Sequence, residues 1–369
     1  MRRTTLLNIL SSILVIIAGL LIGFIILLLT NASVAPRAFG YLLTRGASNM
    51  RWFGDVLFGA TPIIMTGLSV AFAFKTGLFN IGASGQFTFG GFVAIIIGVH
   101  GTMLPPALRI LLCILAAALA GALWGAIPGL LKAFFNVHEV ISSIMTNYIG
   151  MFFVNWAVIT FMFDSGRGTS TRMPSDSALP TMGLDQIFRD GPRVSSVNIG
   201  IIIAIVFALI IWIILEKTTF GYELKACGFN KDAAKYAGIN QNRNIVYSMM
   251  ISGGLAGIGG ALLYLNNIGL SMSIVDVLAS QGFTGISVAF LGLNHPIGII
   301  FSGVFISYLF VGGERMQIVG FAPQIVEMVI AVIIYFCAFV FLVRTFFGNQ
   351  IKRFFKKDKD ADIKGGAKS

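Results

Sequence analysis

Apolar segments with almost no charged residues are the feature that most constrains how this chain folds. They cover residues 9–29, 56–74, 85–99, 107–131, 140–163, 199–215, 245–265, 282–293, 297–311 and 324–343. A helix needs about 20 apolar residues to cross the hydrocarbon core of a bilayer. Only 11% of all residues are charged, against about 25% in soluble domains. We therefore expect an all-α polytopic membrane protein with about ten transmembrane helices.

Three of these segments are too short for a simple crossing. They are residues 85–99, 282–293 and 297–311, and the last two are separated by Asn294, His295 and Pro296. Either these helices are discontinuous, or residues 282–311 form one re-entrant pair. Irregular backbone at membrane depth is tolerated only where protein or a water-filled cavity surrounds it.

The distribution of Lys and Arg indicates the orientation. With a cytoplasmic N-terminus and ten alternating spans, the cytoplasmic segments hold 17 of the 26 Lys and Arg residues. This excess predicts a plasma-membrane protein with both termini in the cytoplasm. It also accounts for the net charge of +11, so the expected surroundings are a lipid bilayer and not nucleic acid. Arg109, at the outer end of its segment, is expected to reach toward the interface.

The same pattern divides the chain into regions. Residues 1–30 are expected to be an N-terminal anchor helix, because the segment is longer than the apolar part of a signal peptide, although Ser33–Ala35 resembles a cleavage site. Residues 31–343 form the transmembrane domain, and residues 344–369 a basic cytoplasmic tail. Long loops are predicted outside at 164–198 and inside at 216–244, and loops of this length are usually functional or disordered.

An internal repeat relates the two halves of the transmembrane domain. Ala83–Thr88 and Ala279–Thr284 match at four of six positions, and the same offset aligns Asn80 with Asp276. The repeats cover about 56–163 and 245–343, and their matching segments run in opposite directions. Inverted repeats with short, interrupted segments at matching positions point to a transport path.

The chemistry of the chain favours a conduit over an enzyme. Its spans are almost free of charge, whereas ion-coupled carriers usually place acids or His there. The chain has no Gly-Lys dipeptide and so no P-loop for ATP hydrolysis. Its three Cys and three His are scattered, which argues against a disulfide framework, a metal site or a membrane enzyme. Energy for uphill transport would have to come through another subunit.

Neutral polar residues in the short and central spans are the candidates for a solute path. On the fifth span they follow one helix face, which suits either a path for a neutral solute or hydrogen bonds between packed helices. The candidate path residues are Asn80, Ser84, Gln86, Ser143, Asn147, Ser280, Gln281 and Thr284. Glycines repeat at intervals of four in Gly19/Gly23, Gly121/Gly125/Gly129 and Gly253/Gly257, which predicts close helix packing.

A short helix is predicted in the cytoplasmic loop at 231–237. Asn230 is a good N-cap, Asp232 suits the helix dipole, and Gly238 is a natural C-terminal cap. A helix of two turns is not stable alone in water. It is therefore either a docking element or an ordinary loop helix on the membrane face.

Several segments resemble one family of transport proteins. Residues 220–240 are similar to the coupling-helix region of ABC importer permeases of the branched-chain amino acid and simple-sugar superfamily, and Gly77–Gln86 to their first-half signature. Residues 132–149 resemble the nucleoside-uptake branch (the basic membrane protein type), with His138 where Asn is common. Gly282–Ser287 and Leu291–Gly298 carry the second-half resemblance, so that it covers about 55–345.

The resemblance implies a fold like that of type II ABC importers and a set of partners. These are a second permease subunit in a heterodimer, a tandem-domain ABC ATPase that holds ATP and Mg, and an extracellular substrate-binding lipoprotein. The chain itself would hold no cofactor and would not be an enzyme. Residues 228–239 would enter the ATPase, with coupling residues Gly228, Phe229, Asn230, Asp232, Ala233, Ala234, Tyr236 and Gly238.

The implied solute is a nucleoside. A simple sugar is the alternative for an ABC permease, and a self-sufficient secondary carrier or facilitator is the alternative outside that class.

Overall fold

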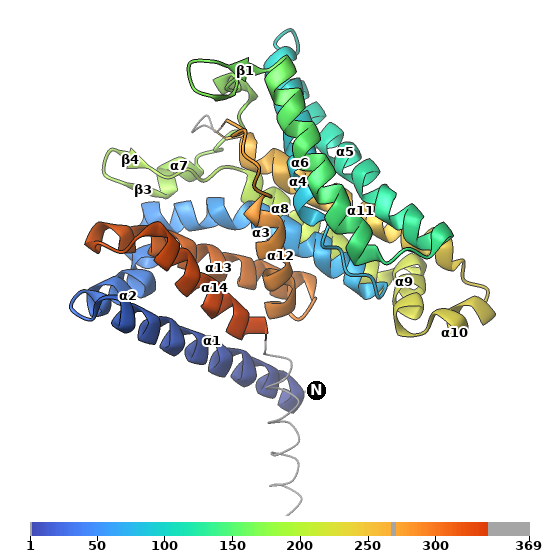
Figure 1. Ribbon diagram of the computed structural model, residues 1–369, viewed down its shortest axis with the longest axis horizontal. Coiled ribbons are helices and arrows are strands. Elements are labelled where there is room, and N and C mark those ends of the chain that lie inside the picture. Colours follow the sequence, from blue (N-terminus) through green and yellow to red (C-terminus); the bar gives the residue numbers. More distant parts are fainter. Residues whose placement is uncertain (1, 267–270, 339–369) are drawn as a thin grey trace, which may run out of the picture. The chain divides into compact units, whose positions relative to one another are not determined.

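The computed structural model describes residues 2–266 and 271–338, and these residues are mostly helical (Figure 1). Within them, seven helical segments are long and apolar enough to cross a membrane. These are α3 (Met50–Lys75), α4 (Ala83–His100), α5 (Pro106–Phe135), α6 (Glu139–Phe161), α8 (Gly200–Lys217), α11 (Gln241–Tyr264), and α13 (Pro296–Met316) with η3 (Gln317–Val319). The chain is therefore an all-α multi-pass membrane protein, as predicted.

The three remaining apolar segments also coincide with helices, namely α1 (Arg2–Asn31), α12 (Ser280–Leu291) and α14 (Pro323–Ala338). Residues 282–311 fall in two helices, α12 and α13, an arrangement that both alternatives for this segment allow. Helix α13 is longer than its apolar segment and long enough to cross, whereas α12 has only 12 residues. The end of the last predicted span, 339–343, and the tail 344–369 lie outside the described residues.

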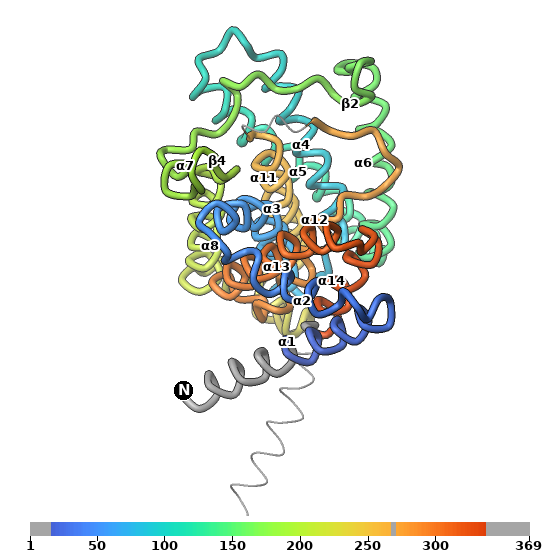
Figure 2. Tube along the Cα trace, turned by 90° about the vertical axis from the view of Figure 1, so that its left-hand side faces the viewer, coloured from blue at the N-terminus to red at the C-terminus, as the bar shows by residue number. Residues whose placement is uncertain are grey.

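The chain divides into two compact units, and the larger is residues 43–312. In it, α11 packs on α5, α4 and α3, and Figure 2 shows α4, α5 and α11 close together. Glycines make the contact of α5 with α11 close: a Cβ on Gly121 would lie 2.3 Å from the carbonyl oxygen of Gly253. The packing role predicted for these glycines is confirmed.

The smaller unit consists of the residues up to Leu42 and those from Gly313 onward. Here α1 packs along α14. A Cβ on Gly19 would lie 3.1 Å from the carbonyl oxygen of Ile333, and a Cβ on Gly23 would lie 3.1 Å from Val329 Cγ1. The spacing of these two glycines therefore also marks a helix contact. The helix α2 (Ala35–Thr44) follows α1.

The remaining elements are short and lie in the connections. They are η1 (Arg45–Ala47), η2 (Ser175–Ser177), α7 (Leu184–Ile187), α9 (Thr219–Phe229), α10 (Lys231–Tyr236), the pair β1 (Phe163–Asp164) and β2 (Thr169–Ser170), and the pair β3 (Arg189–Asp190) and β4 (Arg193–Val194).

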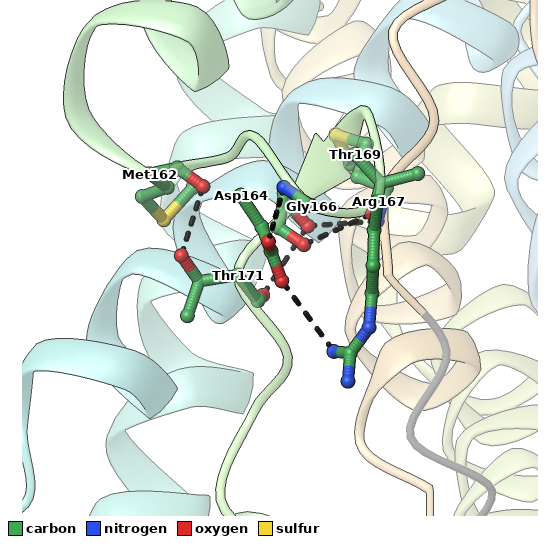
Figure 3. Close-up of polar contacts among 8 residues, drawn as sticks. Met162, Asp164, Gly166, Arg167, Thr169 and Thr171 are labelled. Carbon is green, nitrogen blue, oxygen red and sulfur yellow. Dashed lines mark hydrogen bonds and ion pairs between the residues drawn. The ribbon is translucent and has the colours of Figure 1, made fainter.

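The long loop at 164–198, which we call the outer loop after its predicted side, is ordered by local polar contacts. In the turn between β1 and β2, the amide of Gly166 donates to Asp164 Oδ1 at 3.0 Å, and Arg167 forms an ion pair with the same carboxylate at 3.5 Å (Figure 3). The hydroxyl of Thr171 donates to the carbonyl oxygen of Met162 at 2.9 Å. The backbone carbonyl and amide groups of such a loop are thus partly paired within the loop.

The structure corrects the expectation for Arg109. Its side chain is fully buried, and Nη2 lies 2.6 Å from Asp176 Oδ2 in the outer loop. The guanidinium therefore does not extend to solvent. It fastens the outer loop to the start of α5.

Candidate functional site

The chain turns sharply after α3. It turns at Gly77, whose φ is +73°, a conformation that glycine adopts at no steric cost. Asn80 then donates from Nδ2 to the hydroxyl of Ser69 at 3.4 Å. Ser69 lies six residues before the end of α3, about 9 Å along the helix axis. Helix α4 therefore begins well inside the length of α3.

Helix α12 also begins inside the length of α3. The hydroxyl of Thr66 donates to the carbonyl oxygen of Gln281 at 2.9 Å. Thr66 lies nine residues before Lys75, about 14 Å along the helix. Gly285 makes this contact close, since a Cβ there would lie 2.4 Å from the Thr66 hydroxyl oxygen.

The starts of α4 and α12 meet, and we call this contact the junction. The hydroxyl of Ser84 donates to the carbonyl oxygen of Ala279 at 2.8 Å. A Cβ on Gly282 would lie 2.4 Å from Ser84 Cα, so glycine is required for this approach. The two segments that match in sequence, Ala83–Thr88 and Ala279–Thr284, are thus neighbours in space.

A buried network of amides and hydroxyls supports the α4 side of the junction. Asn80 Nδ2 donates to Gln86 Oε1 at 2.8 Å and to Ser252 Oγ at 2.7 Å. Gln86 Nε2 donates back to Asn80 Oδ1 at 3.2 Å, and the hydroxyls of Ser69 and Ser252 lie 3.0 Å apart. The amide groups of Asn80 and Gln86 are therefore already engaged within the protein.

Asn147 and Ser143 of α6 face the same turn but differ in their bonding. Asn147 Oδ1 accepts from the amide of Gly85 at 2.8 Å, and its Nδ2 donates to the carbonyl oxygen of Ile81 at 3.0 Å. Ser143 is equally buried, yet its hydroxyl has no hydrogen-bond partner. Its Cβ lies 3.4 Å from the position of a Cβ on Gly82, at the start of α4.

The α12 side of the junction is more open. Gly282, Gly285 and Val288 form its buried face. Ser280 is exposed, Phe283 is 41% exposed, and Gln281, Thr284 and Ser287 are half-buried. Of the eight predicted path residues, five are thus buried (Asn80, Ser84, Gln86, Ser143 and Asn147), and the three from the second repeat are accessible.

Sequence reasoning missed several residues of this region. Thr66, Ser69 and Ser252 join α3 and α11 to the junction, and they stand out in the sequence only as isolated hydroxyls within apolar segments. Phe283 and Ser287 lie on the open face of α12. Their spacing of four residues in the sequence indicates that they share one helix face.

The loop at 216–244, which we call the coupling loop after its predicted role, contains two helices, α9 and α10, where the sequence predicted one. The N-cap prediction is confirmed, because Asn230 Oδ1 accepts from the amide of Ala233 at 3.0 Å. Gly238 has a φ of +81° and follows the end of α10, as the sequence indicated.

The predicted coupling residues differ in their accessibility. Phe229 is 90% and Tyr236 94% exposed, and Asn230, Asp232, Ala233 and Gly238 are also exposed. Ala234, in contrast, is buried. Gly228 is exposed as well, and it also packs against the C-terminal end of α3, since a Cβ on it would lie 2.3 Å from the carbonyl oxygen of Lys75.

Charged groups surround the base of this loop. Lys225 pairs with Glu216 at 3.2 Å, and Arg243 with Glu223 at 3.4 Å. His295, in the connection from α12 to α13, has a pKa lowered by burial and by the charge of Lys75, partly offset by Glu216. Its imidazole is therefore held in the neutral form to a lower pH than usual. The described residues contain no group of three His, Cys, Asp or Glu side chains that could hold a metal ion.

The sequence of the chain is similar to that of transport proteins along most of its length. The profile of a family described as "Branched-chain amino acid transport system / permease component" matches residues 53–338. The guanosine ABC transporter permease protein NupP of Bacillus subtilis is 37% identical, over 94% of this chain and 97% of its own length. The nucleoside ABC transporter permease protein NupB of Lactococcus lactis is 35% identical, over 91% and 92%.

A sugar transporter is more distant. The glucose ABC transporter permease protein TsgB13 of Haloferax volcanii is 29% identical, over 88% of this chain and 86% of its own length. No solved structure matches the chain.

Proposed function

Because the chain belongs to the permease component family of branched-chain amino acid transport systems, we propose that it is the permease subunit of an ATP-driven ABC importer for nucleosides. The observation that carries the solute class is the similarity to two permeases named for guanosine and for nucleosides, each over more than nine-tenths of this chain. A simple sugar is the second candidate, favoured by the 29% identity to a glucose permease.

We place the solute path at the junction and along the open face of α12. This helix begins within the depth of the membrane, where irregular backbone requires protein or a water-filled cavity around it. Its open face carries the hydroxyls of Ser280, Thr284 and Ser287, whereas a face in contact with lipid would be apolar. Phe283, on the same face, offers a ring for a flat base.

The buried path candidates have a supporting role in this proposal. Asn80, Gln86 and Asn147 use their amide groups to hold the start of α4. Ser143 is different, because its unpartnered hydroxyl lies beside the first turn of α4. It becomes available to a solute when the junction opens.

The proposed partners follow from the class of transporter. A second permease completes the membrane part, and two different guanosine permease proteins of Bacillus subtilis, NupP and NupQ, both resemble this chain, at 37% and 25% identity. This supports a heterodimer. ATP and Mg bind to a tandem-domain ATPase that contacts α9 and α10, and an extracellular lipoprotein delivers the solute. The complex lies in the plasma membrane, with both termini of this chain in the cytoplasm.

Solute competition tests the proposal. The complete transporter, reconstituted with its ATPase and lipoprotein, should accumulate radiolabelled guanosine or uridine, and a hundredfold excess of glucose should not compete. Accumulation of glucose with no competition by nucleosides would assign the transporter to simple sugars.

A further inference from the structure

Two glycines connect the coupling loop to the segment that leads into the junction. Gly228 lies in the last turn of α9, and Gly77 lies directly after α3. A Cβ on Gly228 would lie 2.3 Å from the carbonyl oxygen of Lys75 and 3.1 Å from the amide nitrogen of Gly77. A Cβ on Gly77 would lie 3.3 Å from Gly228 Cα and from its carbonyl oxygen. Backbone thus packs directly on backbone.

This contact has little freedom to absorb a displacement. Side chains adjust by rotation about χ angles, but two packed backbones move only together or by separating. Gly77 also has a φ of +73°, and its amide donates to the carbonyl oxygen of Phe74 at 3.0 Å. A shift of α9 is therefore passed to the turn at Gly77.

From Gly77 the path to the junction is short and fixed by hydrogen bonds. The hydroxyl of Thr76 donates to Ser248 Oγ at 2.8 Å, and Leu78 is 1% exposed. Asn80 belongs to the buried network described above, and α4 begins three residues later. Seven residues after Gly77, Ser84 bonds to Ala279 at the start of α12.

We propose that Gly228 and Gly77 are positioning residues that transmit movement of the coupling loop to the junction, through residues 76–82. The inference rests on the proposed function, because it assumes an ATPase that moves α9 and α10. It also adds a role for Gly228, which is exposed on the loop and whose backbone packs on the end of α3 within the permease.

A second route starts from the same helix and serves as the comparison. Glu223 of α9 bonds to Asn244 of α11 at 3.1 Å and pairs with Arg243. If force passes mainly along this route, Glu223→Gln should reduce coupling more than a change at Gly228 does. If it passes through the glycines, the order is reversed.

The test measures solute uptake per ATP hydrolysed in the assembled transporter. Gly228→Ala places a methyl group against the backbone of α3, so uptake per ATP hydrolysed should fall at least tenfold in the assembled transporter. Gly77→Asn keeps the left-handed conformation, which Asn tolerates, but presses on Gly228, so a smaller loss of about threefold is expected. Glu223→Gln should change the ratio less than Gly77→Asn does.

The matched control is Gly191→Asn in the outer loop. Gly191 has a φ of +57°, and no other atom lies within 4 Å of the position of a Cβ on it. It should leave uptake per ATP at the value of the unmodified transporter.

An assembled Gly228→Ala transporter with uptake per ATP within twofold of the unmodified value would overturn the inference. If Gly228→Ala does not assemble, Gly77→Asn decides, and an unchanged ratio there overturns it equally. Each variant's uptake per ATP is compared with that of the unmodified transporter, so the test can be made with whichever solute the transporter carries. Failure of the unmodified transporter to accumulate nucleosides would instead contradict the proposed function.

Discussion

The hydroxyl of Ser84 donates a hydrogen bond to the carbonyl oxygen of Ala279 at 2.8 Å, across 195 residues of sequence. This bond joins the first turn of α4 to the residue before α12. Both helices begin within the length of α3, and both begin with the repeated sequence. The two halves of the chain therefore meet at the point where a solute path between inverted repeats is expected.

The first prediction separates structural from solute-binding side chains on α6. Asn147→Ala leaves the amide of Gly85 and the carbonyl of Ile81 buried without partners, at a cost of about 1–3 kcal/mol each. The variant should lower the melting temperature of the detergent-solubilised protein. Ser143→Ala removes a hydroxyl that has no partner, so it should leave the melting temperature unchanged and reduce uptake. Equal destabilisation by both variants would contradict this assignment.

The second prediction concerns the anchoring of the outer loop. Asp176→Asn leaves the buried guanidinium of Arg109 without its counter-charge. Loss of one partner of a buried pair costs about 3–5 kcal/mol, and the low end is expected because Asp176 is half-exposed. Thermal unfolding of the purified protein measures the loss.

The matched control for this ion pair is Asp164→Asn. Asp164 pairs with an exposed Arg167 at 3.5 Å, and exposed pairs contribute about 0–1 kcal/mol. If the two substitutions have the same effect, Arg109 does not fasten the loop.

The sequence predicts features that depend on neighbouring residues, but it does not predict contacts between residues far apart in the chain. Every apolar segment corresponds to a helix, because helix formation in a bilayer is dictated by local composition. The N-cap at Asn230 and the turn at Gly238 were likewise local signals. The pairing of Arg109 with Asp176, and of Asn147 with Gly85, joins residues far apart in sequence. No pattern in a single sequence indicates such pairs.

The sequence also did not predict which of the candidate residues are buried. Five of the eight path candidates are buried, because the same amide and hydroxyl groups suit internal hydrogen bonds as well as a solute. Ala234 reads as part of an exposed docking helix, but packing within the protein covers it.

The third prediction concerns pH. The pKa of His295 is lower in the folded chain than its ordinary value of 6.5. Between the folded-state pKa and 6.5, the unfolded chain therefore binds more protons than the folded one. Stability should therefore be complete above about pH 6.5 and fall as the pH is lowered through this window. His295→Gln should flatten the dependence of melting temperature on pH between about 5.5 and 7.5.

His100→Gln provides the control for the pH prediction. His100 lies at the C-terminal end of α4, whereas Lys75 and Glu216 act on His295, so this variant measures the effect of losing a histidine without those neighbouring charges. A His295→Gln protein that loses stability on acidification as steeply as the unmodified protein would contradict the role of His295.

The fourth prediction concerns the surface offered to the ATPase. Phe229 and Tyr236 are 90% and 94% exposed on the coupling loop. Exposed aromatic side chains are typical anchors of protein interfaces, with losses of about 2 kcal/mol or more on truncation to Ala. Phe229→Ala with Tyr236→Ala should therefore weaken ATPase binding at least thirtyfold in a binding measurement, without changing thermal stability.

The control for the interface is Phe301→Ala on α13. Phe301 is 72% exposed on α13, a helix long and apolar enough to cross a membrane, and its truncation should not affect ATPase binding. Undiminished binding by the double variant would show that α9 and α10 are not the docking element.

The central claim is that this chain is a conduit moved by a separate ATPase. The most direct measurement is nucleoside flux into proteoliposomes that hold either this chain alone or the permease pair with its ATPase and lipoprotein. We predict accumulation against a gradient only in the complete assembly, and only with hydrolysable ATP. Saturable flux of nucleoside through this chain alone, without ATPase or ATP, would contradict the claim and identify a self-sufficient carrier.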